Sequence, residues 1–434
     1  MPKNSSAYTR GVIETTSGDL ATHRLSGRGE ALLAGPALPR YLEEHFARAD
    51  DAWDRVTNPD GYVSMCLSEN KLVWDLLEPK MAASREIPAR VTGYDTMVGA
   101  LSFREALARF LGDRLFGRAV QPEHVITLAG SGTVLEALFY AIADPGDGIL
   151  VPTPSYMGFW PDLETRDELQ ILPVHTSSAK SFQLTTDVLD KALEAAEVPI
   201  KALLFTSPDN PQGRVYGADQ IDEILTWSEQ RQIHVVLDEL YAFSVHGDRE
   251  FVSGTAARPA LDELIHLVWA FSKDFAASGL RCGVLVSENT GVLGAVEGLA
   301  YWSAVSGDTQ YVLEQLISDH EWVSGFIAEN ERRLGEAYRR TVEALDTASI
   351  PYFPAQAGFF LLCDMRQFMD TVTWDAEAAL WTRLHEEAQV NLTPGADCHI
   401  GEPGFMRLCF AGIPTDAVVA WIERLGRYLG SGAI

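Results

Sequence analysis

The stretch Leu267-Val268-Trp269-Ala270-Phe271-Ser272-Lys273 consists of five apolar residues followed by a hydroxyl and an amine. A continuous apolar run of this length predicts a strand that is buried on both faces. Similar runs alternate with segments of helical periodicity between about residues 103 and 286. They lie at 125–128, 148–151, 202–205, 235–237 and 283–286. Buried strands that alternate with helices predict an α/β fold whose mostly parallel sheet is covered on both sides.

Ligand chemistry is expected at the carboxyl ends of strands in such a sheet. Lys273 follows the run at 267–271, and it is the only lysine after Lys201. A partly buried lysine has a depressed pKa, so its free amine can form a Schiff base. A solvated surface lysine is the alternative interpretation. Arg281 lies eight residues after Lys273 and offers a guanidinium suited to phosphate.

A segment of small residues follows the run at 125–128 and contains Ser131, Gly132 and Thr133. It leads into a helix predicted at 134–143. Backbone N–H groups and a hydroxyl there can approach a phosphate at the positive end of the helix. An ordinary helix cap is at least as good an interpretation of this segment taken alone.

Polar residues also follow two other runs. Asp238 comes directly after 235–237, where a carboxylate can pair with a protonated pyridine nitrogen, and Tyr241 follows three residues later. Asn210 lies in the turn 207–213 and can hydrogen-bond a ring oxygen. Each of these residues is equally typical of a helix cap or a loop. The order in which they occur is more specific than any one of them.

The two ends of the chain are predicted to build a smaller α+β domain beside the sheet. A helix is expected at 38–55, a strand at 63–67, and a long helical tract from about residue 295 to 345. The polar start is interpreted as a loosely structured arm. The predicted divisions are the arm at 1–35, the first part of the small domain at 36–92, the large domain at 93–310 and the second part of the small domain at 311–434.

Charge and composition disfavour several classes of protein. The formal net charge of −27, from 34 basic and 61 acidic residues, opposes binding to nucleic acid and to anionic membranes. The five cysteines have no CxxC or CxxH spacing, so no metal site is expected. The start has no apolar segment typical of a signal peptide, and no stretch approaches the roughly 20 apolar residues of a membrane helix. We therefore expect a soluble, cytoplasmic protein.

The succession of motifs resembles the class I/II aminotransferase superfamily of fold type I. The Gly-rich turn before a helix is followed by SPDNPQG at 207–213, LDELY at 237–241 and SKDFAASGLRCG at 272–283. The resemblance covers roughly residues 60 to 425. It implies pyridoxal 5′-phosphate (PLP) as cofactor and a large domain with a mostly parallel seven-stranded sheet between helices. It also implies a smaller α+β domain from both chain ends and a homodimer with shared active sites.

Three segments resemble 1-aminocyclopropane-1-carboxylate (ACC) synthase in particular. They are MCLSENKL at 65–72, ADPGD at 143–147 with VPTPSYMGF at 151–159, and NLTPGADCHIGEPGFMRLCFA at 391–411. The last segment is similar to the carboxyl-terminal signature of that family. General aminotransferases usually match it less well.

The resemblance implies a role for each matching residue. Lys273 would be the Schiff-base lysine and the base for the substrate's Cα proton, and Asp238 would pair with the pyridine nitrogen. Tyr156 would stack on the ring and is counted with the catalytic residues. Tyr241 and Asn210 would bind the 3′-oxygen. The residues that would hold the phosphate are Ser131, Gly132, Thr133, Ser272 and Arg281.

Substrate binding would involve Arg407, Glu69 and Asn210. Arg407 would clamp the α-carboxylate, with a buried structural arginine as the alternative. Glu69 aligns with a synthase glutamate near the substrate's amino and γ region. A carboxylate there can attract the sulfonium of S-adenosylmethionine (SAM) or act as an acid or base at Cβ and Cγ. A helix-capping or salt-bridged glutamate is an equally good interpretation.

Two positions depart from the synthase pattern. Tyr94 matches the aminotransferase tyrosine that reaches the phosphate of the neighbouring subunit, whereas the synthases have a tyrosine where this chain has Met97. Ala270 stands where the synthases commonly have a serine that binds the phosphate. One phosphate contact is therefore missing or replaced.

Three hypotheses follow. The first is an ACC-synthase-like lyase or transferase that removes the Cα proton of SAM or a similar amino acid and expels methylthioadenosine from Cγ, with possible capture by a second substrate. The second is an aminotransferase that moves an amino group between an amino acid and a 2-oxo acid. The third is a regulatory or binding protein without catalysis, which the acidic charge and short amino-terminal arm disfavour.

Overall fold

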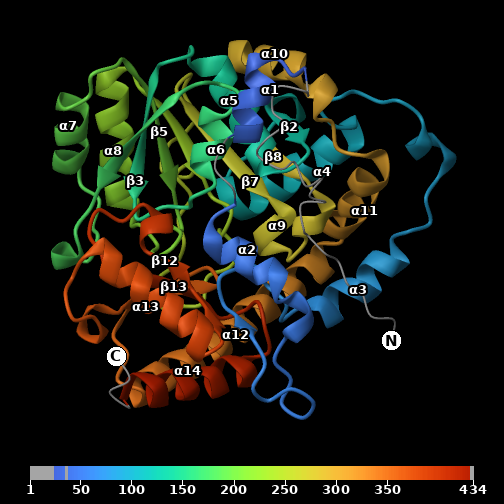
Figure 1. Cartoon of the computed structure of the whole chain (residues 1–434). Helices are drawn as coiled ribbons and strands as arrows, with labels where there is room; N and C mark the ends of the chain where they lie inside the picture. The colour runs from blue at the N-terminus through green and yellow to red at the C-terminus, as the bar shows by residue number, and fades with distance from the viewer. Residues whose placement is uncertain (1–23, 35–37, 431–434) are drawn as a thin grey trace.

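The computed structural model describes residues 24–34 and 38–430. Its largest element is a seven-stranded sheet with the order β2-β8-β7-β6-β5-β3-β4 (Figure 1). The strands are β2 (Val125–Leu128), β3 (Gly148–Thr153), β4 (Gln170–His175), β5 (Ile200–Thr206), β6 (His234–Asp238), β7 (Ile265–Ala270) and β8 (Gly283–Ser287). Strand β8 is antiparallel to both of its neighbours, and the other pairs are parallel. The α/β fold with a mostly parallel seven-stranded sheet is confirmed.

Side chains of the central strands alternate between two hydrophobic clusters. In β6, Val236 joins one cluster, whereas Val235 and Leu237 join the other. In β7, Val268 and Trp269 divide in the same way. Because successive side chains of a strand point to opposite faces, both faces of the sheet are buried. This is the physical reason for the continuous apolar runs in the sequence.

Two sets of helices cover these faces. The first set contributes to the cluster with Val236 and contains α5 (Ser131–Ile142), α6 (Phe159–Glu164) and α10 (Thr290–Leu299). The second set contributes to the cluster with Leu237 and contains α4 (Leu101–Leu111), α7 (Thr186–Glu194), α8 (Ala218–Arg231) and α11 (Gly307–Ser318). A single turn, α9 (Phe271–Asp274), follows β7.

The smaller part of the molecule combines both ends of the described chain (Figure 1). Strand β1 (Val63–Ser64) pairs in parallel with β11 (Val390–Asn391), which joins segments more than 300 residues apart. A four-stranded sheet has the order β12-β13-β10-β9. Its strands are β9 (Tyr352–Phe353), β10 (Phe360–Asp364), β12 (Thr393–Pro394) and β13 (Phe405–Cys409). The helices beside it are α2 (Arg40–Ala47), α12 (His320–Thr347), α13 (Trp374–Glu387) and α14 (Thr415–Gly430). Helix α3 (Trp74–Ala83) instead contacts α11 and contributes Leu77 to the cluster with Leu237.

Several predicted elements were wrong in extent. The helix expected at 38–55 is α2 and a short 3₁₀ turn, and the strand expected at 63–67 has two residues. The tract expected from 295 to 345 is divided between α10, α11 and α12. Strand β4 was missed, because it is an edge strand in which Gln170, Pro173 and His175 are exposed and the apolar run is therefore broken. The predicted domain boundaries remain predictions.

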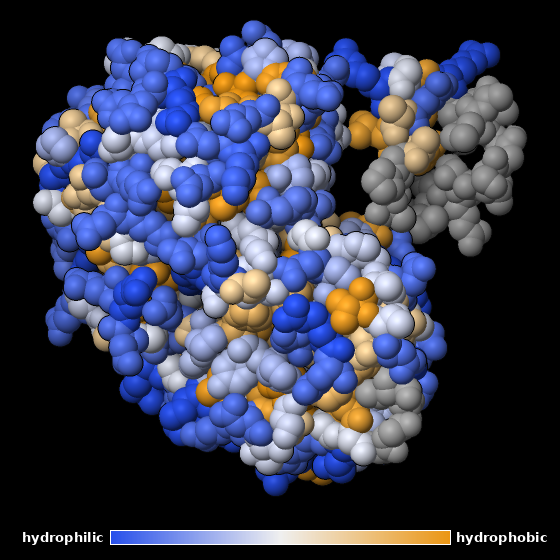
Figure 2. Space-filling view, turned by 90° about the vertical axis from the view of Figure 1, so that its left-hand side faces the viewer, coloured by the Kyte–Doolittle hydropathy of each residue, from blue (hydrophilic) through white to orange (hydrophobic). Residues whose placement is uncertain are grey.

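The amino-terminal arm lies mostly outside the described residues, since 1–23 are not described. Within 24–34 the chain forms α1 (Gly27–Ala34), which has no buried residue and stands apart from the main body in Figure 2. Within the described ranges, no helix has both the length and the apolar character that a transmembrane segment needs.

Asp167 lies in the turn between α6 and β4, and the burial of its carboxyl can be tested. Its side chain is 4% exposed, and neither carboxyl oxygen has a hydrogen-bond partner among the described residues. Burial raises its pKa to about 7, and Glu136 adds to the rise. A raised native-state pKa favours the neutral acid, so native stability falls as pH rises from the ordinary carboxyl range through 7.

We expect Asp167→Asn to stabilise the protein by about 2 kcal/mol at pH 8, because the amide cannot ionise, and by less at pH 5. Urea unfolding at the two pH values measures this difference. The exposed Asp248→Asn is the control, and its effect should be the same at both pH values. A gain from Asp167→Asn that does not grow with pH contradicts the assignment.

Candidate functional site

The ends of four neighbouring strands place polar residues at one edge of the large sheet. Strand β6 ends at Asp238, β7 leads into α9 with Lys273, and β2 leads into α5. Because β8 runs in the opposite direction, its start lies at the same edge, and Arg281 precedes it by two residues. The register pairs Gly283 with both Ala270 and Leu128. The sheet topology therefore brings these residues to one place.

Lys273 is half-buried and is held by a hydrogen bond. Its Nζ donates to the backbone oxygen of Ser68 over 2.6 Å. Burial lowers the pKa of the amine to about 8, and the positive charge of Arg407 lowers it further, while Glu69 and Asp238 oppose the shift. A substantial fraction of this amine is therefore neutral near physiological pH, as a nucleophile or base requires.

Asp238 is a buried acid without a cationic partner in hydrogen-bond range among the described residues. It is 5% exposed and accepts the backbone N–H of Leu240 over 3.3 Å. Burial raises its pKa to about 7, although the Leu240 hydrogen bond and the charge of Lys273 oppose the rise. A cationic N–H group beside this carboxyl would stabilise its ionised form.

Arg407, in β13, is 5% exposed and forms three hydrogen bonds. Its Nη1 donates to Oδ1 of Asn210 over 2.9 Å, and its Nη2 donates to the backbone oxygen of Cys66 over 2.7 Å and to Oγ1 of Thr393 over 3.1 Å. Nε has no partner. No carboxylate lies within salt-bridge distance in the part of the chain that the structure describes. This buried positive charge is suited to an incoming carboxylate.

The segment before α5 forms a cradle for an anion. Residues Ser131, Gly132 and Thr133 open the helix, whose first N–H groups have no acceptor within the helix. Gly130 has a φ of 104°, and a Cβ there would collide with the guanidinium of Arg281. Ser272 is 8% exposed, and its buried hydroxyl has no hydrogen-bond partner among the described residues. The helix start, a guanidinium and an unpaired hydroxyl together fit a phosphate.

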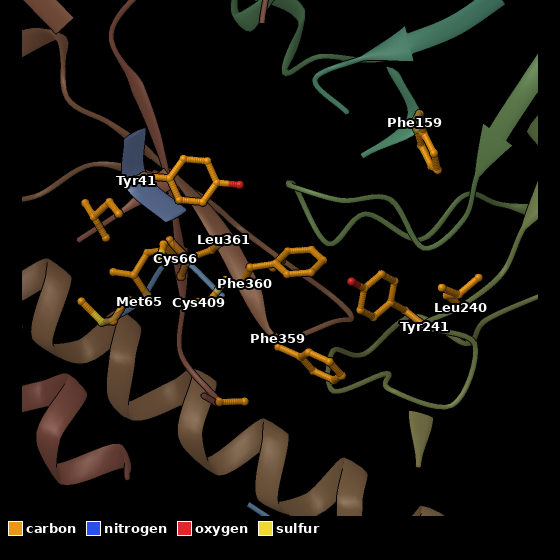
Figure 3. Close-up of a cluster of buried hydrophobic side chains, with 14 of the residues drawn as sticks. Tyr41, Met65, Cys66, Phe159, Leu240, Tyr241, Phe359, Phe360, Leu361 and Cys409 are labelled. Atoms are coloured by element: carbon orange, nitrogen blue, oxygen red, sulfur yellow. The ribbon is translucent and has the colours of Figure 1, made fainter. Parts of the chain in front are cut away.

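Aromatic side chains border the site. Tyr241 is buried, donates to or accepts from Oγ of Ser68 over 2.9 Å, and packs edge to face against Phe359 and Phe360. Figure 3 shows its hydroxyl pointing away from the sheet, toward the strand that carries Phe360. The ring of Tyr156 is 43% exposed and contacts Phe159 edge to face at 5.4 Å. An exposed ring at this position is available to stack on a planar ligand.

Glu69 and Tyr94 differ in how they relate to this cluster. The Glu69 carboxylate is half-exposed, forms an ion pair of 3.5 Å with Lys71, and is close enough to affect the pKa of Lys273. It also lines an open cavity of about 410 Å³ together with Ser272 and Trp74. Tyr94 is fully exposed and makes none of the contacts described above. Within one chain it is therefore separate from the cluster, and its contact with a second copy stays a prediction.

Three residues near the site were not singled out from the sequence. Ser68 contacts both Lys273 and Tyr241. Tyr41 is buried in α2 and donates to Sδ of Met157 over 2.9 Å. Asp162 packs against Gly132, and burial raises its pKa to about 6. Only Ser68 carried a signal, since it lies in the 65–72 segment.

Comparison with known proteins gives a consistent result. The profile of the family "Aminotransferase class I and II" matches residues 64–425. 1-aminocyclopropane-1-carboxylate synthase 9 of Arabidopsis thaliana is 32% identical over 400 residues, covering 87% of this chain and 85% of that protein. 1-aminocyclopropane-1-carboxylate synthase 4 of Oryza sativa subsp. japonica is 32% identical, covering 94% of this chain and 89% of its own.

Solved structures share the fold. A double mutant of Thermus thermophilus aspartate aminotransferase matches with a TM-score of 0.77 and 22% identity, over 93% of this chain and 99% of its own. An aminotransferase from Mycobacterium tuberculosis matches with a TM-score of 0.77 and 20% identity, over 94% of this chain and 100% of its own. At these identities the likeness concerns the fold alone.

We expect Gly130→Ala to weaken binding of PLP at least tenfold, because its Cβ would displace Arg281 and its backbone would be strained at a positive φ. Fluorescence titration of the cofactor-free protein with PLP measures the dissociation constant. Gly279→Ala is the matched control, since a Cβ at Gly279 meets no atom within 4 Å. Equal affinities of the two variants and the wild type for PLP would contradict the assignment of this segment as a phosphate cradle.

Proposed function

Because the chain belongs to the class I and II aminotransferase family and is similar to ACC synthases over most of its length, we propose that it acts on SAM or a closely similar amino acid. The proposed reaction removes the Cα proton and breaks the Cγ–S bond, so that methylthioadenosine leaves with the bonding electron pair and Cγ forms a new bond, either to Cα in a three-membered ring or to a second substrate. Family membership implies PLP as the cofactor. The observation that carries the proposal is that Glu69 lines a cavity with Ser272 and lies close enough to Lys273 to affect the pKa of its amine.

The residues of the site fit PLP. The α5 start, Arg281 and the unpaired hydroxyl of Ser272 would hold its phosphate. Asp238 would pair with the protonated ring nitrogen. The positive charge there would favour the ionised form of this carboxyl, whose pKa is raised by burial. When bound, PLP withdraws electrons from the substrate's Cα and so makes its proton removable. Lys273 is the amine that would hold the cofactor, and Tyr156 would stack on the ring.

Arg407 and Asn210 would orient the amino-acid substrate. The guanidinium offers its charge and its unpaired Nε to the α-carboxylate. Asn210 has its Oδ1 engaged by Arg407, which leaves its Nδ2 as the donor for the 3′-oxygen of the cofactor, together with Tyr241. One hydrogen bond therefore couples the substrate anchor to the cofactor. Such coupling fixes the Cα proton in line with the base, Lys273.

The chain segment 66–69 determines where Glu69 lies. The backbone oxygen of Cys66 accepts from Arg407, and Ser68 contacts Lys273 and Tyr241. Glu69 is the next residue, and its carboxylate pairs with Lys71 over 3.5 Å while its charge opposes the lowering of the Lys273 pKa. A negative charge at this place would attract the sulfonium of SAM and could transfer a proton at Cβ or Cγ.

The second candidate function is transfer of an amino group to a 2-oxo acid. It uses the same Lys273, Asp238 and Arg407, and the half-exposed ion pair of Glu69 with Lys71 is the observation that favours it. In that case Glu69 is a surface carboxylate without a role in the reaction. The two candidates therefore make opposite predictions for substitution of Glu69.

We expect the PLP-loaded protein to release methylthioadenosine from SAM, as detected by mass spectrometry, and Lys273→Ala to abolish the release. Glu69→Gln should lower the rate by about a hundredfold or more, because the charge that favours the sulfonium is lost. Lys71→Gln, which changes the ion-pair partner alone, is the control and should change the rate by less than tenfold.

Two results would contradict this assignment. Intact SAM after incubation with protein of full PLP content is one. The other is a Glu69→Gln variant with wild-type release. Formation of a 2-oxo acid from a simple amino acid, unaffected by Glu69→Gln, would instead support the aminotransferase.

We also propose a homodimer in which Tyr94 of one copy completes the phosphate site of the other. Tyr94→Ala and Lys273→Ala should each give inactive or weakly active protein at limiting PLP. Mixed dimers contain one site with both residues intact, so unfolding and refolding the two variants together should restore about one quarter of the wild-type activity. The control mixture combines Lys273→Ala with Tyr140→Ala, which changes another exposed tyrosine, in place of Tyr94→Ala. Activity that stays at the sum of the separate variants contradicts shared sites.

A further inference from the structure

Glu377 is a buried carboxylate that no basic side chain balances. It lies in α13, is 1% exposed, and belongs to none of the ion pairs found in the described residues. Its Oε1 accepts the N–H of Ala396 over 2.9 Å. Its Oε2 accepts the N–H groups of Gly404 over 2.5 Å and Phe405 over 3.4 Å. Burial raises its pKa, and these three hydrogen bonds oppose the rise.

The three donors lie at the two ends of one loop. Residues 395–404, which we name the hairpin loop, connect β12 to β13. Those strands pair Thr393 with Arg407 and Pro394 with Met406, and Thr393 also accepts a hydrogen bond from Arg407. Glu377 thus binds the loop where it leaves β12 and where it enters β13. Phe405 is two residues before Arg407.

The hairpin loop also contacts the large sheet's side of the molecule. The N–H of Ser155 donates to the oxygen of Cys398 over 2.9 Å. The ring of His399 stacks on Trp160 at 3.3 Å. Glu402 accepts from the N–H and the hydroxyl of Ser178 over 2.6 and 2.8 Å. Ser155 is the residue before Tyr156, so the loop reaches the segment that carries the ring-stacking tyrosine.

We propose that Glu377 is a positioning residue that fixes Arg407 relative to Tyr156. Hydrogen bonds to an ionised acceptor are about twice as strong as those between neutral groups, and three of them converge on this one side chain. They hold both ends of the hairpin loop, which leads into the strand of Arg407 and contacts Ser155 beside Tyr156. The proposal rests on the proposed function, because Arg407 is assigned there to the substrate carboxylate and Tyr156 to the cofactor ring.

The chemical consequence concerns orientation. Arg407 would anchor the α-carboxylate, and Tyr156 would lie against the cofactor ring. The position of one residue relative to the other therefore determines how the Cα–H bond is oriented relative to the ring. Misplacement by about 1 Å can cost a hundredfold in rate. A carboxylate buried behind the loop is a rigid way to hold that geometry, since it has no mobile counter-ion.

The experiment compares two aminooxy reagents that form an oxime with PLP in the holoenzyme, a reaction that breaks the bond from PLP to Lys273 and frees the lysine amine. Aminooxyacetate carries a carboxylate for Arg407, and O-methylhydroxylamine does not. We expect Glu377→Gln to slow the reaction with aminooxyacetate about tenfold, because an amide replaces one acceptor by a donor. The rate with O-methylhydroxylamine and the PLP content should remain unchanged. Glu377→Asp, which keeps the charge, should recover part of the selectivity.

Two further variants make the result decisive. Glu386→Gln is the matched control on the same helix, at an exposed position, and should behave as the wild type. Arg407→Leu should abolish the preference for aminooxyacetate, and a preference that persists would refute the proposed carboxylate site itself. If Arg407→Leu loses the preference while Glu377→Gln keeps it, the positioning role is overturned. Equal slowing of both reagents by Glu377→Gln also overturns it, because a general packing defect would act on both.

Discussion

A positive charge that is buried without an acidic partner among residues 24–34 and 38–430 is the constraint around which this site is built. Arg407 lies in the interior, and its neighbours are the oxygen atoms of Cys66, Asn210 and Thr393. Removing an ion from water costs several kcal/mol, which neutral acceptors offset only in part. The three chain segments that carry these oxygen atoms must therefore keep their positions relative to β13. An arriving carboxylate would supply the missing negative charge, which is why this arrangement favours amino-acid ligands.

Asp238 presents the same constraint with the opposite sign. It is a buried acid whose pKa is raised to about 7, and it lies at the end of β6 near the Lys273 amine. The two unbalanced groups, Asp238 and Arg407, belong to different sheets. A cofactor with a protonated ring nitrogen and a substrate with a carboxylate would balance both at once. Holding these two groups without partners lowers the stability of the unliganded protein. Binding of the cofactor and the substrate would offset that cost.

The sequence predicted the sheet better than its surroundings. Runs such as 235–237 and 267–271 are apolar because both faces of the sheet are covered, and that cause acts on every residue of the strand. Strand β4 has only one protected side, so its run is interrupted at Pro173 and it was missed. In the site, Lys273, Asp238 and Arg407 were identified by motif. Glu377 was not, because its partners are backbone N–H groups, which leave no mark on the sequence.

The sequence by itself determined six of the seven strands of the large sheet and the residues at their ends, because local burial and turn chemistry act over a few neighbouring positions. Only the tertiary structure decided which of those residues meet. Lys273 is bound to Ser68 across 205 positions, and Arg407 to Asn210 across 197. The closure of the hairpin loop on Glu377 is decided at the same level. Contacts of this range depend on how whole elements pack, and no periodicity records them.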